Sequence, residues 1–235
     1  MNLVVEKLKK NFGTKQVLKD INFKFEEGKI YGLLGRNGAG KTTLFNCLNE
    51  DLEVDGGEFF LEENNQKRKI SYDDIGYVLS TPVVPEFLTG REFLKYFIDI
   101  NKDKITNLKT IDEYFKIVKF KKEDGDRLMR DYSHGMKSKL QMLVYIISSP
   151  KVILLDEPLT SFDVVVAEEM KQLLKAMKKD HILIFSTHIL ELALDLCDEI
   201  VVLNNGTLNL IEAKDLDNKE FKNKIIEVLK DEENA

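Results

Sequence analysis

A glycine-rich segment near the N-terminus has the residue types and spacing of a phosphate-binding loop. Gly35 to Thr42 read GRNGAGKT, which fits the pattern GxxxxGK[ST]. Glycines let successive backbone N–H groups turn inward around phosphate oxygens, and a helix beginning at about Lys41 adds the positive end of its dipole. In this pattern Lys41 reaches the β and γ phosphates, and the Thr42 hydroxyl ligates Mg²⁺. The alternative is a glycine-rich surface turn, but an apolar strand before the loop and a helical pattern after it favour phosphate binding.

Two adjacent carboxylates, Asp156 and Glu157, follow the apolar run Val152 to Leu155. In an open α/β sheet, ligands bind beyond the carboxyl ends of the strands, and the loop that begins at Gly35 also follows a strand. We therefore expect both sites to face one nucleotide. Asp156 would hold Mg²⁺ through its water shell, and Glu157 would orient or deprotonate the attacking water. The alternative is a polar strand end that turns at Pro158, which is less favoured beside a phosphate loop.

The elements that must position these residues follow from the apolar patterns. Short β-prone or continuous apolar runs predict strands at 3–5, 21–25, 29–34, 58–61, 75–79, 152–155 and 182–185. From about 86 to 148 apolar residues recur at helical spacing, which predicts a helical insertion in an α/β frame. Further helical patterns cover 164–178 and 221–229, and 201–210 read as a closing hairpin around Asn204-Asn205-Gly206.

Composition excludes several classes of protein. The 235 residues are 43% hydrophobic and 32% charged, which suits one large domain or two small lobes. The net charge is -6 and the basic residues form no stripe, so nucleic acid is not an expected partner. Cys47 and Cys197 have no CxxC or Cys/His company, which favours two reduced cysteines in a cytosolic protein. The N-terminus lacks a signal-peptide pattern, and no apolar run approaches the roughly 20 residues of a membrane span.

The order and spacing of these motifs resemble the nucleotide-binding subunit of ABC transporters over nearly the whole chain. The phosphate loop corresponds to Walker A, and Asp156-Glu157 to Walker B. Between them, Tyr132 to Lys137 read YSHGMK, which is similar to the family signature LSGGQ and opens a helix over 136–147. Taken alone, this segment would be a serine N-cap. Its place between the two Walker motifs makes it the signature, whose Ser133 and Gly135 can present donors to an anion.

The remaining motifs of the family follow in order. Segment 160–163, which ends at Asp163, is similar to the D-loop, and His188 ends a strand as the family's switch histidine does. Lys10 to Gly13 look like the A-loop, which implies that Phe12 stacks on adenine. The alternative for Phe12 is an ordinary core phenylalanine. His134 and His181 have no such role in the family and read as surface or structural residues.

The resemblance implies an α/β fold with a P-loop NTPase core and a mainly parallel sheet, an N-terminal antiparallel β subdomain and a helical insertion subdomain. One ABC ATPase domain would cover 1–235, with the core at 1–85 and 150–235 and the helical signature subdomain at 86–149. It also implies that ATP and Mg²⁺ are bound between two head-to-tail copies, or between this chain and a related ATPase chain. The chain would sit at the cytoplasmic face of the membrane through a separate integral membrane permease subunit.

The residues that the resemblance places at the site fall into three groups. The catalytic group is Lys41, Glu157 and His188. The metal group is Thr42, Ser80 and Asp156. Nucleotide contacts are implied for Phe12, Asn37, Gly38, Ala39, Gly40, Lys41, Thr42, Thr43 and Asp163, with Ser133 and Gly135 supplied by the other copy.

Two departures from the family pattern bear on function. Ser80 stands where the family has a glutamine that touches Mg²⁺ and the attacking water. A bridging water would replace it, and either coupling to the membrane part is looser or Thr81 or Glu86 takes part. The signature has His134 for glycine and Met136 for glutamine, which, with segment 126–132, is similar to a branch that exports drugs, antimicrobial peptides and some polysaccharides. We therefore expect an exporter ATPase for a peptide or small molecule.

Two other functions compete with this expectation. A soluble ABC protein acting on ribosomes or DNA usually has two nucleotide domains or a long coiled coil, and this sequence has one nucleotide site and no heptads. A non-hydrolysing or regulatory nucleotide-binding module is favoured only by Ser80, since Glu157 and His188 are both present.

Overall fold

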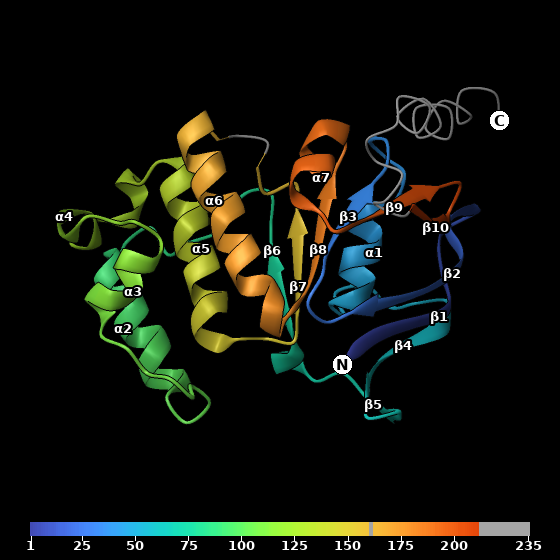
Figure 1. Cartoon of the computed structure of the whole chain (residues 1–235), viewed down its shortest axis with the longest axis horizontal. Helices are drawn as coiled ribbons and strands as arrows, with labels where there is room; N and C mark the ends of the chain where they lie inside the picture. Colours follow the sequence, from blue (N-terminus) through green and yellow to red (C-terminus); the bar gives the residue numbers. More distant parts are fainter. Residues whose placement is uncertain (160–161, 212–235) are drawn as a thin grey trace. The chain divides into compact units, whose positions relative to one another are not determined.

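The computed structural model describes residues 1–159 and 162–211 (Figure 1). It contains a four-stranded sheet in the order β2-β1-β4-β5 and a six-stranded sheet in the order β10-β9-β3-β8-β7-β6. The chain forms two compact units. Unit 1 holds 1–77, 151–156 and the described part of the chain from 178 onward, and unit 2 holds 78–150 and 157–177. The antiparallel N-terminal sheet and the mainly parallel core sheet confirm the predicted α/β fold.

The four-stranded sheet belongs to unit 1 and is antiparallel. Its strands are β1 (Asn2–Phe12), β2 (Lys15–Glu26), β4 (Gly56–Glu63) and β5 (Gln66–Arg68). The sequence predicted only fragments of β1 and β2 and missed β5. One reason is that register shifts interrupt β1 after Val5 and again around Leu8, and Lys7 adopts a φ of 51°. Such irregularities break the alternation of apolar and polar residues that marks a strand in a sequence.

The core sheet carries the strands that the apolar runs predicted. They are β3 (Ile30–Leu34), β6 (Ile75–Val78), β7 (Val152–Asp156), β8 (Ile182–Thr187), β9 (Glu199–Asn204) and β10 (Thr207–Ile211). Every residue of β3, β7 and β8 is buried, as expected for central parallel strands. Strand β10 is antiparallel to β9 and closes the sheet with the predicted hairpin.

The register of the parallel strands brings their carboxyl ends to one level. Leu34, the last residue of β3, pairs with Thr187, the last residue of β8. Asp156, the last residue of β7, pairs with Ser186. The segments that begin at Gly35 and at His188 therefore leave the sheet at the same edge, as Glu157 does directly after Asp156.

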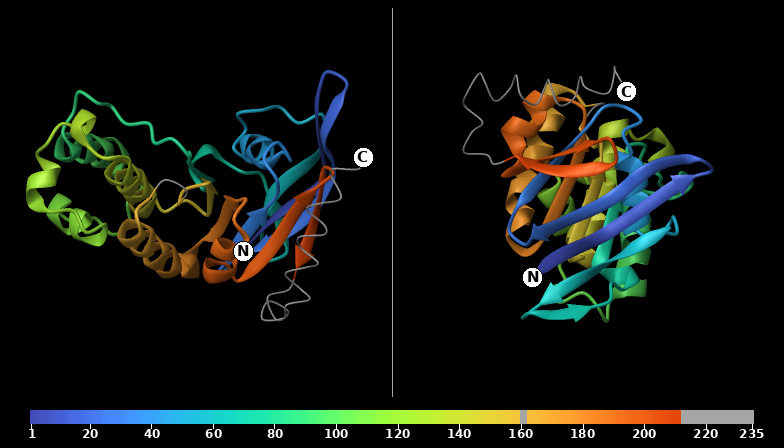
Figure 2. Two further views of the ribbon diagram at one scale, coloured as in Figure 1. Left: turned by 90° about the horizontal axis from the view of Figure 1, so that it is seen from above. Right: turned by 90° about the vertical axis from the view of Figure 1, so that its right-hand side faces the viewer.

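Short helices cover the core sheet of unit 1. They are α1 (Lys41–Leu48), α7 (Leu190–Leu196) and the 3-10 turns η1 (Tyr72–Asp74) and η3 (Lys178–Asp180). Helix α1 contacts β7, and α7 contacts β3 (Figures 1 and 2). Helix α1 begins at Lys41, as predicted, whereas the sequence analysis missed α7. The hydrophobic core of this unit joins both sheets through residues such as Phe25, Tyr31, Phe45 and Leu154.

Unit 2 is mainly helical. Its helices are α2 (Gly90–Asn101), α3 (Ile111–Ile117), α4 (Lys122–Gly125), η2 (Met129–Asp131), α5 (His134–Ser148) and α6 (Val164–Met177). Thr89 and Thr110 begin α2 and α3 with capping boxes, each completed by a glutamate three residues later. Leu94, Phe115 and Leu143 lie in the core that these helices share. The predicted helix over 136–147 begins two residues earlier, at His134, because Ser133 is its N-cap.

Two further expectations concern the last predicted helix and membrane-spanning segments. The predicted helix over 221–229 lies outside the described residues. Within the residues that the structure describes, none of the helices is both long and apolar enough to span a bilayer.

The buried strands predict where unit 1 is most sensitive to substitution. Leu154 is fully buried in β7, so Leu154→Ala should lower the free energy of unfolding by about 2–5 kcal/mol. Leu210 is 46% exposed on β10, so Leu210→Ala should change it by less than about 0.5 kcal/mol. Urea denaturation followed by circular dichroism measures both values. Equal effects of the two substitutions would contradict this account of the core.

Candidate functional site

The loop between β3 and α1 has the backbone shape that its glycines permit. Gly38 and Gly40 have φ values of 86° and 107°, a region that residues with a side chain rarely adopt. Gly40 is the N-cap of α1, and a Cβ atom there would lie 2.8 Å from Val17 Cγ1. Glycine is therefore required at this position both by conformation and by space. Asn37 and Gly38 are exposed, so the loop surface is accessible.

Lys41 folds back over the loop that precedes it. Its Nζ atom donates hydrogen bonds to the carbonyl oxygens of Gly35, at 2.8 Å, and Arg36, at 3.2 Å. The residue is only 6% exposed. A buried ammonium beside a helix N-terminus makes this end of α1 electropositive, which suits an anionic phosphate chain.

The two sequence motifs meet at the Asp156 carboxylate. Thr42 Oγ1, from the start of α1, donates to Asp156 Oδ2 at 2.8 Å. Two further hydroxyls reach the same carboxylate: Ser186 Oγ donates to Oδ1 at 2.6 Å, and Tyr77 Oη lies 3.5 Å from Oδ2. Unit 1 thus brings Lys41, Thr42 and Asp156 together, as expected of a single nucleotide site.

The sequence analysis assigned no role to Tyr77 or to Ser186. The available signal was a polar residue near the end of a buried strand, which is costly unless its polar atom is satisfied. This signal marks both residues, at the ends of β6 and β8, but it does not say which carboxylate they meet.

A carboxylate and a hydroxyl are the oxygen ligands that Mg²⁺ prefers, and Mg²⁺ at phosphate sites commonly uses one or two carboxylates together with the phosphates. The described residues contain no cluster of three or more His, Cys, Asp or Glu side chains that could hold a metal ion by themselves. Thr42 and Asp156 supply a hydroxyl and a carboxylate, which are oxygen ligands of the types that Mg²⁺ uses at phosphate sites.

Two other predicted residues of unit 1 are exposed. His188 follows the last residue of β8, at the edge of the sheet where Gly35 also leaves it. Phe12, at the end of β1, is 48% exposed, with Lys10 Nζ at 5.6 Å from its ring centroid. This exposure excludes the alternative of an ordinary core phenylalanine and leaves an aromatic face available.

Glu157 has an unusual backbone for a residue with a side chain. Its φ is 47°, in the left-handed region, directly after the end of β7. Residues held in this region cost of order 1–3 kcal/mol and cluster at functional sites. Asp156 is buried, whereas Glu157, directly after it, is partly exposed.

In unit 2, the signature segment is the N-terminus of α5. Ser133 is the N-cap, and its hydroxyl accepts a hydrogen bond from Met136 N at 3.2 Å. A Cβ atom at Gly135 would lie 3.2 Å from Val166 Cγ1, so the close approach of α6 favours glycine there. The serine N-cap, which was the alternative for this segment, is thus present, and it is compatible with a role in binding an anion.

Asp163 caps the other long helix of unit 2. Its Oδ1 atom accepts from Val165 N and Val166 N, both at 3.0 Å. Residues 160 and 161 of the predicted D-loop lie outside the described residues. The next residue, Phe162, packs against the signature, since its ring centroid lies 5.9 Å from that of His134. His134 is therefore half-buried against an aromatic ring.

Ser80 lies in an exposed stretch after β6, together with Thr81. Glu86, the other residue considered at this position, binds a signature residue instead: its Oε1 accepts from Lys137 Nζ at 2.8 Å. This hydrogen bond and the charge of Lys137 lower the pKa of the Glu86 carboxyl. Glu86 is thus an anion fixed beside the start of α5.

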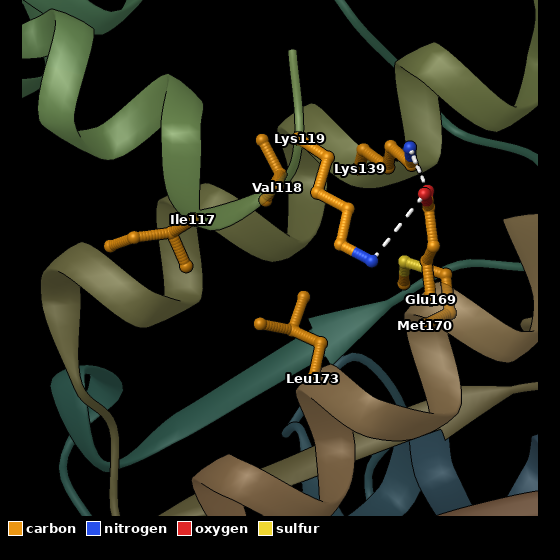
Figure 3. A pocket seen from close by; sticks show the side chains of 7 residues that line it. All are labelled: Ile117, Val118, Lys119, Lys139, Glu169, Met170 and Leu173. Carbon is orange, nitrogen blue, oxygen red and sulfur yellow. Dashed lines mark hydrogen bonds and ion pairs between the residues drawn. The ribbon is translucent and has the colours of Figure 1, made fainter.

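A small cavity in unit 2 is separate from all of these residues (Figure 3). It has a volume of about 20 Å³, room for about one water molecule. Lys139 Nζ and Lys119 Nζ approach the Glu169 carboxylate beside it, at 2.5 and 3.6 Å. None of the predicted site residues lines this cavity.

Comparison with known proteins identifies the family. The sequence pattern of the ABC transporter family matches residues 18–160. The Bacillus subtilis ABC transporter ATP-binding protein YdbJ is 31% identical over 210 residues, which cover 88% of this chain and 67% of that protein. The chain belongs to the ABC transporter family. It is an ATP-binding ABC ATPase subunit that powers transport.

Two further comparisons concern a related sequence and a solved structure. A Chlorella vulgaris protein described as a probable sulfate/thiosulfate import ATP-binding protein is 30% identical, with 88% of this chain and 89% of that protein covered. The dimeric structure of MJ0796, a bacterial ABC transporter cassette, has a TM-score of 0.74 at 20% identity and covers 90% of this chain and 98% of that chain. The second likeness shows the fold, and the first shows that related sequences include an importer component.

The position of Lys41 makes a direct prediction for ATP binding by this ABC subunit. Lys41→Met removes the buried ammonium beside the loop, so the affinity for ATP should fall at least about tenfold, since hydrogen bonds to charged groups contribute about 1.5–3 kcal/mol. Lys24→Met is the matched control, because Lys24 forms an exposed ion pair with Glu62 on the N-terminal sheet. Equilibrium binding of a fluorescent ATP analogue measures both. A parent-like affinity for Lys41→Met would exclude the assigned role.

Proposed function

We propose that this ABC subunit binds ATP together with Mg²⁺ at the Lys41, Thr42 and Asp156 site and hydrolyses it there. The observation that carries the proposal is the 2.8 Å hydrogen bond from Thr42 Oγ1 to Asp156 Oδ2, which joins two motifs far apart in the sequence. The hydroxyl donates a hydrogen bond to the carboxylate, so the lone pairs of its oxygen remain available to a metal ion. The remaining loop residues proposed to contact nucleotide are Asn37, Gly38, Ala39, Gly40 and Thr43.

In this proposal the chain's own groups orient the reactants and balance charge. Mg²⁺, when bound, neutralises charge that develops on the phosphate oxygens. Lys41 offers its ammonium to the β and γ phosphates, and His188 contacts the γ phosphate. Glu157 orients the attacking water or takes its proton. Its left-handed backbone supports this assignment, because strain of this kind is retained at functional sites.

Adenine is proposed to stack on Phe12. An aromatic ring that is 48% exposed at the end of a rigid strand offers a flat apolar surface, and stacking contributes about 1–3 kcal/mol per base. Lys10 lies near the same ring, so the platform carries a positive charge on one side.

The second half of each site is proposed to come from another copy of this chain or from a related ATPase chain. Ser133 and Gly135 would present the N-terminus of α5 to the nucleotide of the partner, with Asp163 also near it. The dimeric arrangement of the MJ0796 cassette supports this proposal, as does the exposure of Ser133 and Asp163. Nucleotide binding would then close the dimer, and product release would open it.

Transport is proposed to be export of a peptide or small molecule, through a separate integral membrane permease subunit that holds this chain at the cytoplasmic face of the membrane. Support comes from the signature, in which His134 and Met136 resemble the drug and antimicrobial-peptide exporter branch. The proposed core at 1–85 and 150–235 would bind nucleotide, and the helical subdomain at 86–149 would pass motion to the permease.

A regulatory nucleotide-binding module is the second candidate. Ser80, in place of the family's glutamine, favours it, since serine cannot reach as far toward a metal ion or a water molecule. As a proposed metal-site residue, Ser80 would act through a bridging water.

The assignment of Glu157 predicts a large loss of turnover on substitution. Glu157→Gln should lower the rate of Mg-ATP hydrolysis by about 10² to 10⁴ and should accumulate an ATP-bound dimer. Steady-state phosphate release and size-exclusion chromatography with ATP measure the two effects. Glu168→Gln, on the exposed face of α6, is the control and should match the parent. Hydrolysis by Glu157→Gln at the parent rate would show that Glu157 is not the base.

Export predicts that cargo stimulates the ATPase only when the permease is present. The purified complex of chain and permease, reconstituted in vesicles, should hydrolyse ATP faster when candidate peptides or drugs are added on the cytoplasmic side. The same complex carrying Glu157→Gln controls for contaminating ATPases. Stimulation only by solutes on the opposite side would favour import, and no stimulation by any candidate would remove support for the peptide or drug class.

A further inference from the structure

The Asp156 carboxylate is held on both of its oxygens by hydroxyl groups. Oδ1 accepts from Ser186 Oγ at 2.6 Å, while Oδ2 accepts from Thr42 Oγ1 at 2.8 Å and faces Tyr77 Oη at 3.5 Å. The three donors come from three different elements of unit 1, namely β8, α1 and β6. Only Thr42 belongs to the Walker motifs, so Ser186 and Tyr77 are additional parts of this arrangement.

The chemical type of these donors matters. Asp156 is 7% exposed, and a buried carboxylate must be hydrogen-bonded. A lysine or arginine partner would satisfy the oxygens and also cancel their charge. Hydroxyl groups satisfy the oxygens and leave the negative charge, which is the property that a divalent cation requires of this site.

Ser186 fixes one side of the carboxylate through the backbone. Its residue pairs directly with Asp156 in the parallel ladder of β7 and β8 and is fully buried. The distance between the two Cα atoms is thus set by the sheet, and the hydroxyl reaches Oδ1 without a flexible chain. With Oδ1 anchored, rotation of the carboxylate is restricted and Oδ2 stays directed at Thr42.

Tyr77 approaches the other side. Its ring packs edge-on against Phe45, with centroids 6.0 Å apart and planes at 82°, and Phe45 lies one turn after Thr42 in α1. The phenol is the donor of this contact, and its oxygen lies 3.5 Å from Asp156 Oδ2. One side chain therefore contacts both the helix that carries Thr42 and the carboxylate that Thr42 must meet.

We propose that Tyr77 and Ser186 are positioning residues that orient the Asp156 carboxylate toward the Thr42 hydroxyl and thereby set the affinity of the nucleotide site for its divalent cation. This inference rests on the proposed magnesium site. Neither residue is assigned a contact with nucleotide, so their effect should appear in the metal dependence of binding and not in the intrinsic affinity for ATP.

The test uses the full chain with Tyr77→Phe and Ser186→Ala. Binding of a fluorescent ATP analogue is measured in EDTA and over a range of Mg²⁺ concentrations, and binding of Mn²⁺ with ADP is followed by electron paramagnetic resonance. Each variant should raise the metal concentration at half-saturation by about tenfold, since loss of a group that orients a metal ligand costs 10–100-fold in metal affinity. Affinity for the analogue in EDTA should stay within about twofold of the parent.

Tyr31→Phe is the matched control for the loss of a buried phenol. Tyr31 is fully buried in unit 1. Its hydroxyl accepts a hydrogen bond, at 2.8 Å, from the backbone N–H of Glu26, which lies on the N-terminal sheet. This variant should keep the metal dependence of the parent. In an Asp156→Asn background, adding Tyr77→Phe should have no further effect, because the group that it orients is gone.

The outcomes separate the inference from the function on which it rests. A parent chain whose nucleotide binding does not respond to Mg²⁺ or Mn²⁺ would overturn the magnesium site itself. A normal parent with parent-like Tyr77→Phe and Ser186→Ala would overturn the positioning role, as would an equal loss of affinity in EDTA. If Ser186→Ala does not fold, Tyr77→Phe, which keeps the ring and its packing on Phe45, decides the question alone.

Discussion

The nucleotide site depends on the register between three buried parallel strands. Because Leu34 pairs with Thr187 and Asp156 pairs with Ser186, β3, β7 and β8 end at one edge of the sheet. A shift by one residue would turn the Asp156 side chain to the opposite face of the sheet. The fully apolar interiors of these strands and their burial on both faces hold the register. The position of the Asp156 carboxylate thus depends on the packing of the apolar residues that precede it in β7.

At this edge, unit 1 holds two buried ionisable side chains, Lys41 and Asp156. Lys41 gives its hydrogen bonds to carbonyl oxygens of the loop, and Asp156 receives its hydrogen bonds from hydroxyls. The polar atoms of both buried side chains are therefore hydrogen-bonded. A metal–nucleotide complex carries negative phosphates and a positive metal ion. The ammonium group of Lys41 is complementary to the phosphates, and the carboxylate of Asp156 is complementary to the metal ion. Unit 2 contributes a different kind of site, the N-terminus of α5 with its Ser133 cap.

The sequence predicts much of this arrangement, and the elements and contacts that it misses have physical explanations. Continuous apolar runs gave the positions of β3, β7 and β8, and the glycine pattern gave the start of α1 at Lys41. The full length of β1 was hidden because Lys7 and the register shifts interrupt its alternation. The contacts of Tyr77 and Ser186 with Asp156 were hidden for another reason: they join residues 79 and 30 positions apart, and only the pairing of strands decides that they meet.

The inward fold of Lys41 bears on how the site responds to its ligand. By bonding to Gly35 and Arg36, the ammonium joins the start of α1 to the start of the loop and closes the intervening residues into a ring. A loop tied at both ends has fewer conformations than a free one. Restraining a binding loop in this way lowers the entropy that is lost when a ligand binds, which is the meaning of preorganisation.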